Sequence, residues 1–548
     1  MTNQISVPSP MIGRRNFLLG VSALASATAL ASCSSSTGGG GGGGAATDPA
    51  ALDALLPNYV PVQYAEPAFP SVNGSPLIYT EYPPLPLASS VPETPGAGSR
   101  ITTMQPVYGA VPPSLPDNDY NAMMNEHLGA DLIIGSADAG TYAEKLAAVL
   151  ASPKDVADWT VIPVEMQPPR FEEAVEACFE DLTPYLSADN IEKYPNLAGI
   201  QTDTWRFCFF NGKLMSIPYP QVNVSGFMLS RQDLMDELGL EAPTNAEELV
   251  EFAKAATDPG ANRWALDDIW DQLGNIFKVP PMWRIDGGNL VHRYETDEYA
   301  AALEYNADLY AAGVVHPDAM VGSGDNLVRF SAGNIVMFAA GWGGWAQTLR
   351  QVGDSIPGYN PQAVAPFAAD GGTPVIWQAP SVSMNNFFKK GTEPAKIEEM
   401  LRIANFCAAP FGTTELEMIR SGFEGVHFER ADDGAPLVNE KFNLEYGGGY
   451  LFLCSCERVI TEVSLPGFGE AIGTWTTDAV QYLEQPAFFG QNIQTPAHLS
   501  GLDQQMTDFE ADVFNGRKSV GDLDAAVESW RAAGGEELRE HYAQYLDA

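Results

Sequence analysis

The sequence predicts an α/β fold, in which helices cover sheets that contain parallel strand pairs. Two observations lead to this class. From residue 101 onward, short apolar runs alternate with stretches whose apolar residues recur at helical spacing. The chain of 548 residues is also 45% hydrophobic, which supplies enough apolar side chain for more than one large core. A disordered chain and a fibre are therefore excluded.

The first part of this pattern begins at residue 101. Residues 101–107, 131–134 and 158–163 are strand candidates, and residues 118–128 and 141–150 are helix candidates. In the second helix, Tyr142, Leu146 and Leu150 fall on one face, which suits packing against a sheet. Strands that alternate with helices at this spacing favour a sheet with parallel pairs.

The alternation continues to the C-terminal region. Residues 213–218, 225–230 and 334–340 read as strands, and residues 231–238 and 297–312 read as helices. Gly239 ends the first of these helices, and Thr244 with Glu247 forms a capping box that opens another. The last stretch differs, because residues 502–515, 520–533 and 536–546 predict three successive helices.

The N-terminus carries the signals of export and lipid attachment. Arg14 and Arg15 precede an apolar run at 17–31, which is typical of a twin-arginine signal peptide. The following Leu-Ala-Ser-Cys33 resembles a bacterial lipobox. We therefore expect residues 1–32 to be removed and Cys33 to carry lipid, which anchors the protein to the extracytoplasmic face of the cell membrane. Residues 33–100 then form a glycine-rich tether and a proline-rich lead.

Charge and missing motifs exclude several function classes. Asp and Glu number 70 against 29 Lys and Arg, and the resulting net charge of −41 argues against a nucleic acid partner. The chain lacks a phosphate-binding loop, a His-Glu-x-x-His pair and a Gly-x-Ser-x-Gly elbow, and its six histidines are dispersed. We therefore predict no catalytic residue, no metal site and no cofactor.

The cysteines predict no disulfide framework. Five follow Cys33, which is an odd number, and they are scattered along the chain. Cys454 and Cys456 come directly after the apolar run 450–453, so we expect them in the interior of a strand.

Aromatic residues beside glycine and proline are the best candidates for ligand contact. Trp342 and Trp345 stand among glycines directly after the buried strand 334–340, where a loop would leave a sheet. Trp283, Trp377 and Tyr219 occupy similar places. Flat aromatic rings suit the apolar faces of sugar rings, although each of these residues could instead pack in a core. We favour ligand contact for the pair Trp342 and Trp345.

Beyond residue 101 the chain resembles family 1 of the bacterial extracellular solute-binding proteins, the lipoprotein receptors of carbohydrate ABC importers. The residues that carry this resemblance come in the family's order: 142–146, 179–185, 212–218, 229–239, 333–342, 422–428 and 516–520. The lipobox at Cys33 precedes them.

The resemblance implies a two-lobed periplasmic-binding-protein-like fold with hinge-linked α/β lobes and a helical C-terminal region. Lobe 1 would take residues 101–218 and 361–410, and lobe 2 residues 219–360 and 411–548. It also implies a monomer that is not an enzyme, binds a carbohydrate between its lobes and docks on the permease subunits of an ABC transporter. The alternatives are a secreted lipoprotein glycoside hydrolase, which would use two of the many carboxylates, and a receptor for peptides or another polar solute.

Overall fold

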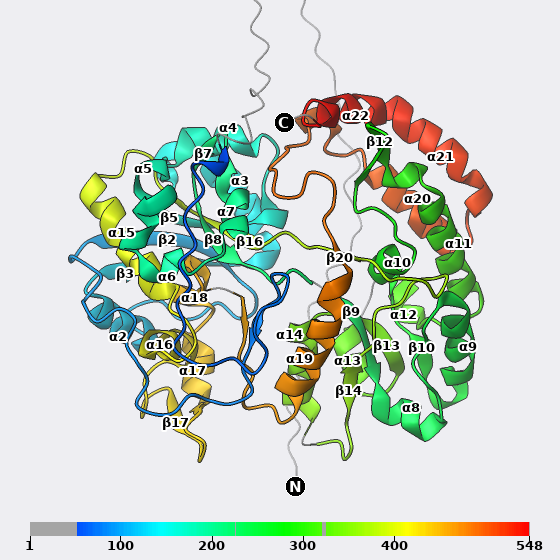
Figure 1. The fold of residues 1–548 in the computed structure, drawn as a ribbon, viewed down its shortest axis with the longest axis horizontal. Coiled ribbons are helices and arrows are strands. Elements are labelled where there is room, and N and C mark those ends of the chain that lie inside the picture. Colours follow the sequence, from blue (N-terminus) through cyan, green and yellow to red (C-terminus); the bar gives the residue numbers. More distant parts are fainter. Residues whose placement is uncertain (1–51, 225, 321–324, 354, 457, 547–548) are drawn as a thin grey trace, which may run out of the picture. The chain divides into compact units, whose positions relative to one another are not determined.

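The structure, a computed structural model, describes residues 52–546 apart from residues 225, 321–324, 354 and 457. The predicted signal peptide, Cys33 and the glycine run lie outside the described residues. The described residues belong to one compact unit of the chain. Two separate sheets with their helices occupy the two halves of the view in Figure 1.

The first sheet has six strands. Its order is β3-β2-β5-β16-β8, with β4 also paired to β2. The three neighbours of β2 run parallel to it, whereas β16 is antiparallel to both β5 and β8. The strands are β2 (Arg100–Val107), β3 (Asp131–Ile133), β4 (Ser136–Asp138), β5 (Trp159–Pro163), β8 (Ile217–Pro220) and β16 (Val382–Phe388).

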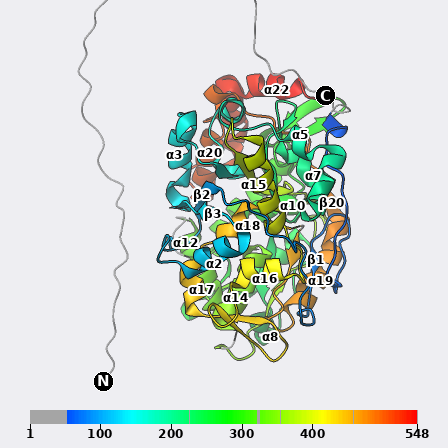
Figure 2. The ribbon, with the colours of Figure 1, turned by 90° about the vertical axis from the view of Figure 1, so that its left-hand side faces the viewer.

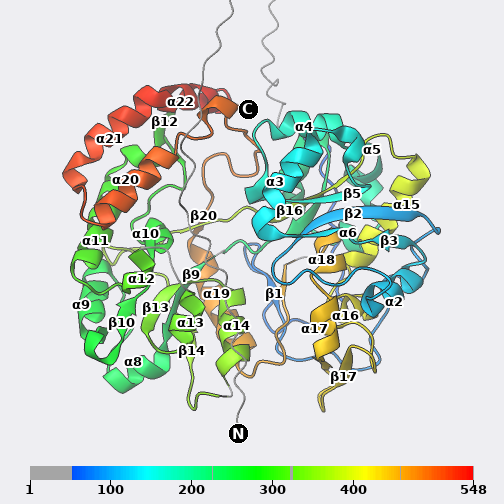
Figure 3. The same cartoon turned by 180° about the vertical axis from the view of Figure 1, so that it is seen from behind.

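Helices cover both faces of the first sheet. On one face, α3 (Ala139–Leu150) and α4 (Phe171–Cys178) pack on Met104, Ile162 and Phe387 (Figure 3). On the other, α2 (Asp119–Leu128) and α15 (Pro394–Cys407) pack on Ile101 and Val161 (Figure 2). We call this sheet and its helices the first lobe.

The second sheet has four strands in the order β10-β13-β9-β14. They are β9 (Phe227–Arg231), β10 (Trp264–Leu266), β13 (Ile335–Ala340) and β14 (Pro361–Ala363). One face is covered by α9 (Ala246–Ala256), α10 (Trp270–Ile276) and α11 (Asp297–Ala311). The other is covered by α13 (Asn326–Ser331), α14 (Trp342–Val352) and α19 (Phe468–Ala479). We call this sheet and its helices the second lobe.

From β2 onward, three stretches of the described chain connect the lobes. The chain passes to the second lobe between β8 and β9, returns between β14 and β16, and crosses again between α18 (Gly449–Leu453) and α19 (Figure 1). Each lobe is therefore discontinuous in sequence. This topology brings the end of β8 and the start of α14 to the same region.

The division after residue 410 differs from the one we expected. We placed residues 411–548 in lobe 2, but α16 (Thr414–Ser421), α17 (Glu440–Glu445) and α18 belong to the first lobe. Phe442, Tyr450 and Leu453 are buried in the same core as β2 and α15. The large apolar side chains of this stretch find cover there, and the chain joins the second lobe only at α19.

The proline-rich lead is packed from residue 52 onward. Leu56 is buried in the core of the first lobe, and Ile78 is buried beside α19 of the second. The short strand β1 (Leu77–Ile78) pairs in parallel with β19 (Val459–Ile460) of the third connection. Much of the segment that we expected to be an irregular lead is thus part of the folded body.

The C-terminal helices α20 (Gln504–Phe514), α21 (Leu523–Trp530) and α22 (Glu536–Ala543) match the three that the sequence predicts. The remaining strands form short pairs: β6 (Phe209–Phe210) with β7 (Lys213–Leu214), β11 (Trp283–Asp286) with β12 (Asn289–His292), β15 (Ile376–Trp377) with β20 (Leu483–Glu484), and β17 (Phe428–Arg430) with β18 (Pro436–Val438). Short helices complete the fold: α5 (Thr183–Leu186), α6 (Pro195–Ala198), α7 (Thr202–Trp205), α8 (Gln232–Leu238) and α12 (Pro317–Met320).

Two local predictions need correction. The cap of α9 is Asn245, whose side chain accepts the amide hydrogen bond of Glu248 at 2.9 Å, so the helix begins one residue later than Thr244 implies. Cys454 and Cys456 are buried but do not lie in a strand: the apolar run before them forms the short helix α18, and both cysteines follow it in irregular chain. Because an apolar run of this length suits either element, periodicity could not distinguish them.

Among the described residues, no helix has the length and apolar character needed to cross a membrane. That part of the chain also contains no group of three or more His, Cys, Asp or Glu side chains placed to hold a metal ion.

Candidate ligand-binding cleft

A cavity of about 370 Å³ lies where the two lobes meet, and we call it the cleft cavity. The first lobe supplies Tyr219 of β8, Ser383 of β16 and Arg420 of α16, and the second supplies Trp342 of α14. The connections between the lobes add Gln221, Cys456 and Arg458. Its volume falls within the range of about 300–1,000 Å³ that is common for small-molecule sites.

Two aromatic rings, one from each lobe, line the cleft cavity. Tyr219 is partly exposed, and its ring meets Phe452 edge-on at 6.0 Å between centroids. Trp342 is the first residue of α14 and is also partly exposed, with one side against the core of the second lobe. Each lobe therefore presents an aromatic ring to the cavity from a fixed backbone position.

The polar groups of the cleft cavity are neutral or basic. Arg458 is anchored by hydrogen bonds from Nη1 to the carbonyl of Gly74 at 2.9 Å and from Nη2 to the hydroxyl of Thr204 at 3.3 Å. Arg420 lies near Tyr219: burial raises the pKa of the phenol, while the positive charge of Arg420 opposes that shift. None of the described lining residues is acidic.

Two other cavities of similar size are confined to single regions of the fold. One, of about 490 Å³, lies between the lead and α2 and α16 of the first lobe, beside Glu93, His127 and Glu415. The other, of about 440 Å³, lies on α20 and α21 beside Lys518 and Asp522. Since neither is lined by both lobes, neither would change with their relative motion.

The family model described as bacterial extracellular solute-binding protein matches residues 119–391 of this chain, a segment that holds most of both sheets. The chain belongs to this family. Its members are non-enzymatic transport receptors, and this membership confirms the expectation that the chain is not an enzyme.

Curated relatives of this solute-binding protein are distant. The lipoprotein LipO of Bacillus subtilis (strain 168) is 24% identical over 262 residues, which cover 44% of this chain and 50% of LipO. This match therefore spans about half the length of that relative. The polygalacturonan/rhamnogalacturonan-binding protein YtcQ of the same organism is 22% identical over 376 residues, which cover 65% of this chain and 74% of YtcQ.

A solved structure confirms the fold class. The alginate-binding protein AlgQ2, in its crystal structure without calcium ion, superposes on the solute-binding protein with a TM-score of 0.60 at 15% identity. The superposition covers 84% of this chain and 100% of AlgQ2. The predicted two-lobed, periplasmic-binding-protein-like α/β fold is thus confirmed.

The structure separates the five aromatic residues that the sequence proposes as ligand contacts. Tyr219 and Trp342 line the same cavity. Trp345, one turn further along α14, is only 1% exposed and packs edge-on against Phe227 and Phe468. The expectation that Trp345 contacts ligand is wrong for this conformation, because core side chains already cover the ring.

Trp283 and Trp377 also lie away from the cleft cavity. Trp283 is 3% exposed in the core of the second lobe, where it meets His292 edge-on at 4.7 Å and lies beneath the Arg539 guanidinium. Trp377 is partly exposed on β15, which pairs with β20, and does not line the cavity. Ligand contact by Trp283 is excluded by the same packing argument.

Arg420 and Ser383 are cavity residues that the sequence did not reveal. Arg420 occupies the last turn of α16, where a basic residue is common because it interacts favourably with the helix dipole. Ser383 belongs to a strand that also carries the polar residues Asn385 and Asn386. Neither residue stands out from its neighbours in sequence. The pairing of β16 with β8 brings Ser383 to Tyr219, and the packing of α16 in the core of the first lobe, through Ile419, brings Arg420 there.

Proposed function

We propose that this protein captures an oligosaccharide in the cleft cavity and delivers it to the membrane subunits of an ABC importer. The observation that carries the proposal is that two aromatic rings, Tyr219 of one lobe and Trp342 of the other, line one cavity of about 370 Å³. The carbohydrate-binding names of YtcQ and AlgQ2 support the same substrate class.

The chemistry of the cleft cavity suits a sugar. Aromatic faces pack against the C–H faces of pyranose rings, and Gln221 and Ser383 offer donors and acceptors for ring hydroxyls. Hydrogen bonds from neutral side chains orient a polyol without forming a covalent bond. The site therefore fits reversible capture rather than chemical conversion.

Delivery depends on motion of the lobes. Because the lobes are linked by connecting segments, a small change of backbone angles in those segments would rotate one lobe against the other. We propose that ligand bridges Tyr219 and Trp342 and favours the closed form, which docks as a monomer on the permease. The energy for transport would come from the importer's ATPase, since this chain lacks a phosphate-binding loop.

We further propose that a lipid on Cys33 holds the receptor at the extracytoplasmic face of the membrane, after export through the twin-arginine signal at Arg14 and Arg15. The name of the relative LipO supports lipid attachment. In cells of the source organism, Cys33→Ala should release the protein from the membrane fraction. Retention of that variant in the membrane fraction would contradict this anchor.

A thermal-shift panel of oligosaccharides, peptides and polyols tests the substrate class, because a ligand that binds the native state raises the melting temperature. Titration of tryptophan fluorescence then gives affinities for those oligosaccharides that raise the melting temperature. Trp342→Ala and Tyr219→Ala should each weaken binding about tenfold or more, and Trp342→Phe should retain part of it because a ring remains. Tyr64→Ala, at an exposed position on the lead, is the control outside the cavity.

The outcomes separate the alternatives. Stabilisation by peptides alone would replace the carbohydrate proposal with a peptide receptor. Shorter sugars appearing during incubation would indicate a hydrolase. If the double variant Tyr219→Ala/Trp342→Ala keeps its affinity for oligosaccharide, the binding site lies outside the cleft cavity.

A further inference from the structure

Arg420 differs from the other arginines of the described chain. Every other described arginine donates at least one hydrogen bond to a side chain or a backbone carbonyl. Arg420 makes no hydrogen bond or ion pair with the described residues, and its Nε is buried without a partner. Since an unmet buried donor costs free energy, such a group is explained best by a missing partner.

This guanidinium faces the cleft cavity, where it lines the wall together with Tyr219 and Arg458. No described residue of that wall is acidic, although acids outnumber bases 70 to 29 in the whole chain. Two guanidinium groups therefore border this cavity, and no carboxylate does so among the lining residues that the structure describes, in a protein whose net charge is −41. A nearby negative charge brought by ligand would be stabilised there.

The opposite wall adds to the positive potential. Trp342 opens α14, and the cap residue Gly341 has no side chain with which to satisfy the first amide groups of the helix. The N-terminus of a helix carries partial positive charge. Arg420 of the first lobe and the start of α14 of the second thus contribute the same sign of potential to one cavity.

We propose that the ligand is an anionic oligosaccharide and that the Arg420 guanidinium binds its carboxylate or sulfate group. This inference rests on the proposed function and narrows its substrate class. The planar fork of a guanidinium pairs with an oxyanion through two parallel hydrogen bonds, while Tyr219 and Trp342 pack on the sugar rings. A neutral oligosaccharide of the same shape would leave Arg420 unpaired and would bind less tightly.

Matched probes test this in the purified protein. Calorimetric titrations compare trigalacturonate with its carboxyl-reduced form, in which each carboxylate is a CH₂OH group, and a sulfated galactotriose with unsulfated galactotriose. At least one anionic probe should bind about tenfold to hundredfold more tightly than its neutral counterpart. The pair of probes with the larger anionic-to-neutral affinity ratio identifies whether carboxylate or sulfate is the preferred anion.

Variants of Arg420 locate the effect. Arg420→Gln should reduce the anionic-to-neutral affinity ratio about tenfold, and Arg420→Lys should restore part of the ratio. Because Arg420 holds no described partner, Arg420→Gln should retain the melting temperature of the unsubstituted protein. Arg100→Gln, at an exposed ion pair with Asp131 on the first lobe, is the matched control and should retain the ratio.

The results distinguish failure of this inference from failure of the proposed function. If neutral probes bind as tightly as anionic ones, the anionic ligand is wrong. If Arg420→Gln leaves the ratio intact, the assignment of the anion to Arg420 is wrong. In both cases the oligosaccharide receptor stands. If neither kind of sugar binds, while another class in the thermal-shift panel does, both proposals are wrong.

Discussion

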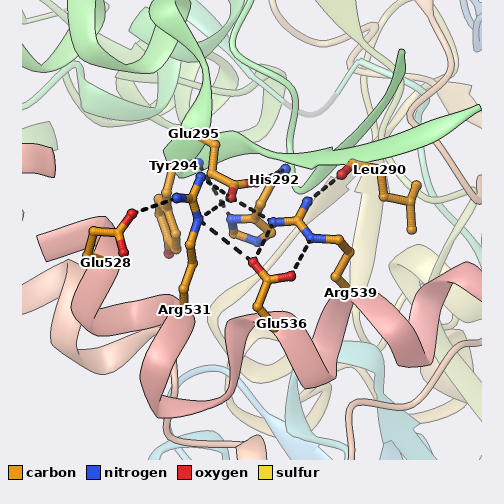
Figure 4. Close-up of polar contacts among 8 residues, drawn as sticks. All are labelled: Leu290, His292, Tyr294, Glu295, Glu528, Arg531, Glu536 and Arg539. Atoms are coloured by element: carbon orange, nitrogen blue, oxygen red, sulfur yellow. Dashed lines mark hydrogen bonds and ion pairs between the residues drawn. The ribbon is translucent and has the colours of Figure 1, made fainter. Parts of the chain in front are cut away.

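Glu295 accepts a hydrogen bond of 2.6 Å from Arg539 of the last helix, α22 (Figure 4). The same carboxylate oxygen accepts a second one of 2.7 Å from Arg531, at the turn between α21 and α22. The carboxylate of Glu295 is only 6% exposed. This acid therefore ties the C-terminal helices to the start of α11, and the helical region is an integral part of the second lobe.

We predict that Glu295→Gln lowers the free energy of unfolding by about 1–3 kcal/mol at pH 7, because two guanidinium groups lose their anion. Urea denaturation followed by circular dichroism measures the change. Glu528→Gln is the control, since Glu528 also pairs with Arg531 but is exposed. Equal losses in both variants would contradict a specific role for Glu295.

The same contact predicts a pH dependence. Burial raises the pKa of Glu295, but hydrogen bonds from Arg539, the His292 amide and Arg531 outweigh it, so the pKa lies below its usual value of 4.5. A depressed folded-state pKa gives stability that is present above the unfolded-state value and is lost as the pH falls through the folded-state value. Stability should thus decline below about pH 4.5, and Glu295→Gln should make this decline shallower. If the stability of the variant declines as steeply as that of the unsubstituted protein, acids other than Glu295 cause the decline.

A buried acid also holds the lead to the first lobe. Glu415 of α16 is 1% exposed and accepts hydrogen bonds from the Ser89 hydroxyl at 2.6 Å and the Val91 amide at 3.0 Å. Glu415→Ala should destabilise the protein by about 1–3 kcal/mol and expose the lead to limited proteolysis, because those donors lose their acceptor. Glu440→Ala, at an exposed position on α17, should do neither. An unchanged cleavage rate in Glu415→Ala would show that other contacts hold the lead.

The two tryptophans of α14 should respond differently to substitution. Trp345→Ala should cost about 3–5 kcal/mol of stability, because it leaves a cavity beside Phe227 and Phe468. Trp342→Ala should cost much less stability and should mainly lower ligand affinity. Thermal denaturation measures the loss of stability in both variants, and fluorescence titration measures the loss of ligand affinity. If Trp342→Ala mainly lowers stability and Trp345→Ala mainly lowers affinity, the assignment of Trp342 to the cavity is wrong.

The cysteines should react slowly in the native protein. Burial raises the pKa of the Cys208 thiol to about 12 and also raises that of Cys407, so little thiolate is present at neutral pH. N-ethylmaleimide followed by mass spectrometry should modify these residues only after unfolding in urea. Cys456 lines the cleft cavity and should react first, with protection by bound ligand. Rapid native labelling of Cys208 or Cys407 would contradict the packing of the first lobe.

The sequence alone determined the local elements and the class of fold. Its apolar periodicity identified α3, α11 and the C-terminal helices, and Gly239 marked the end of α8, where the backbone takes the left-handed conformation at φ 67°. These features depend on residues a few positions apart. Short-range sterics and hydrogen bonding decide them, so they can be read from the chain directly.

Only the tertiary structure decided which of these residues face the cleft cavity. Trp342 and Trp345 share one helix and similar glycine neighbours, yet one lines the cavity and the other is covered by Phe227 and Phe468. Arg420 is an ordinary helix-end arginine until the packing of α16 in the core of the first lobe brings it near Tyr219. Burial and the lack of a partner arise from contacts between segments that are remote in sequence, and no local pattern encodes them.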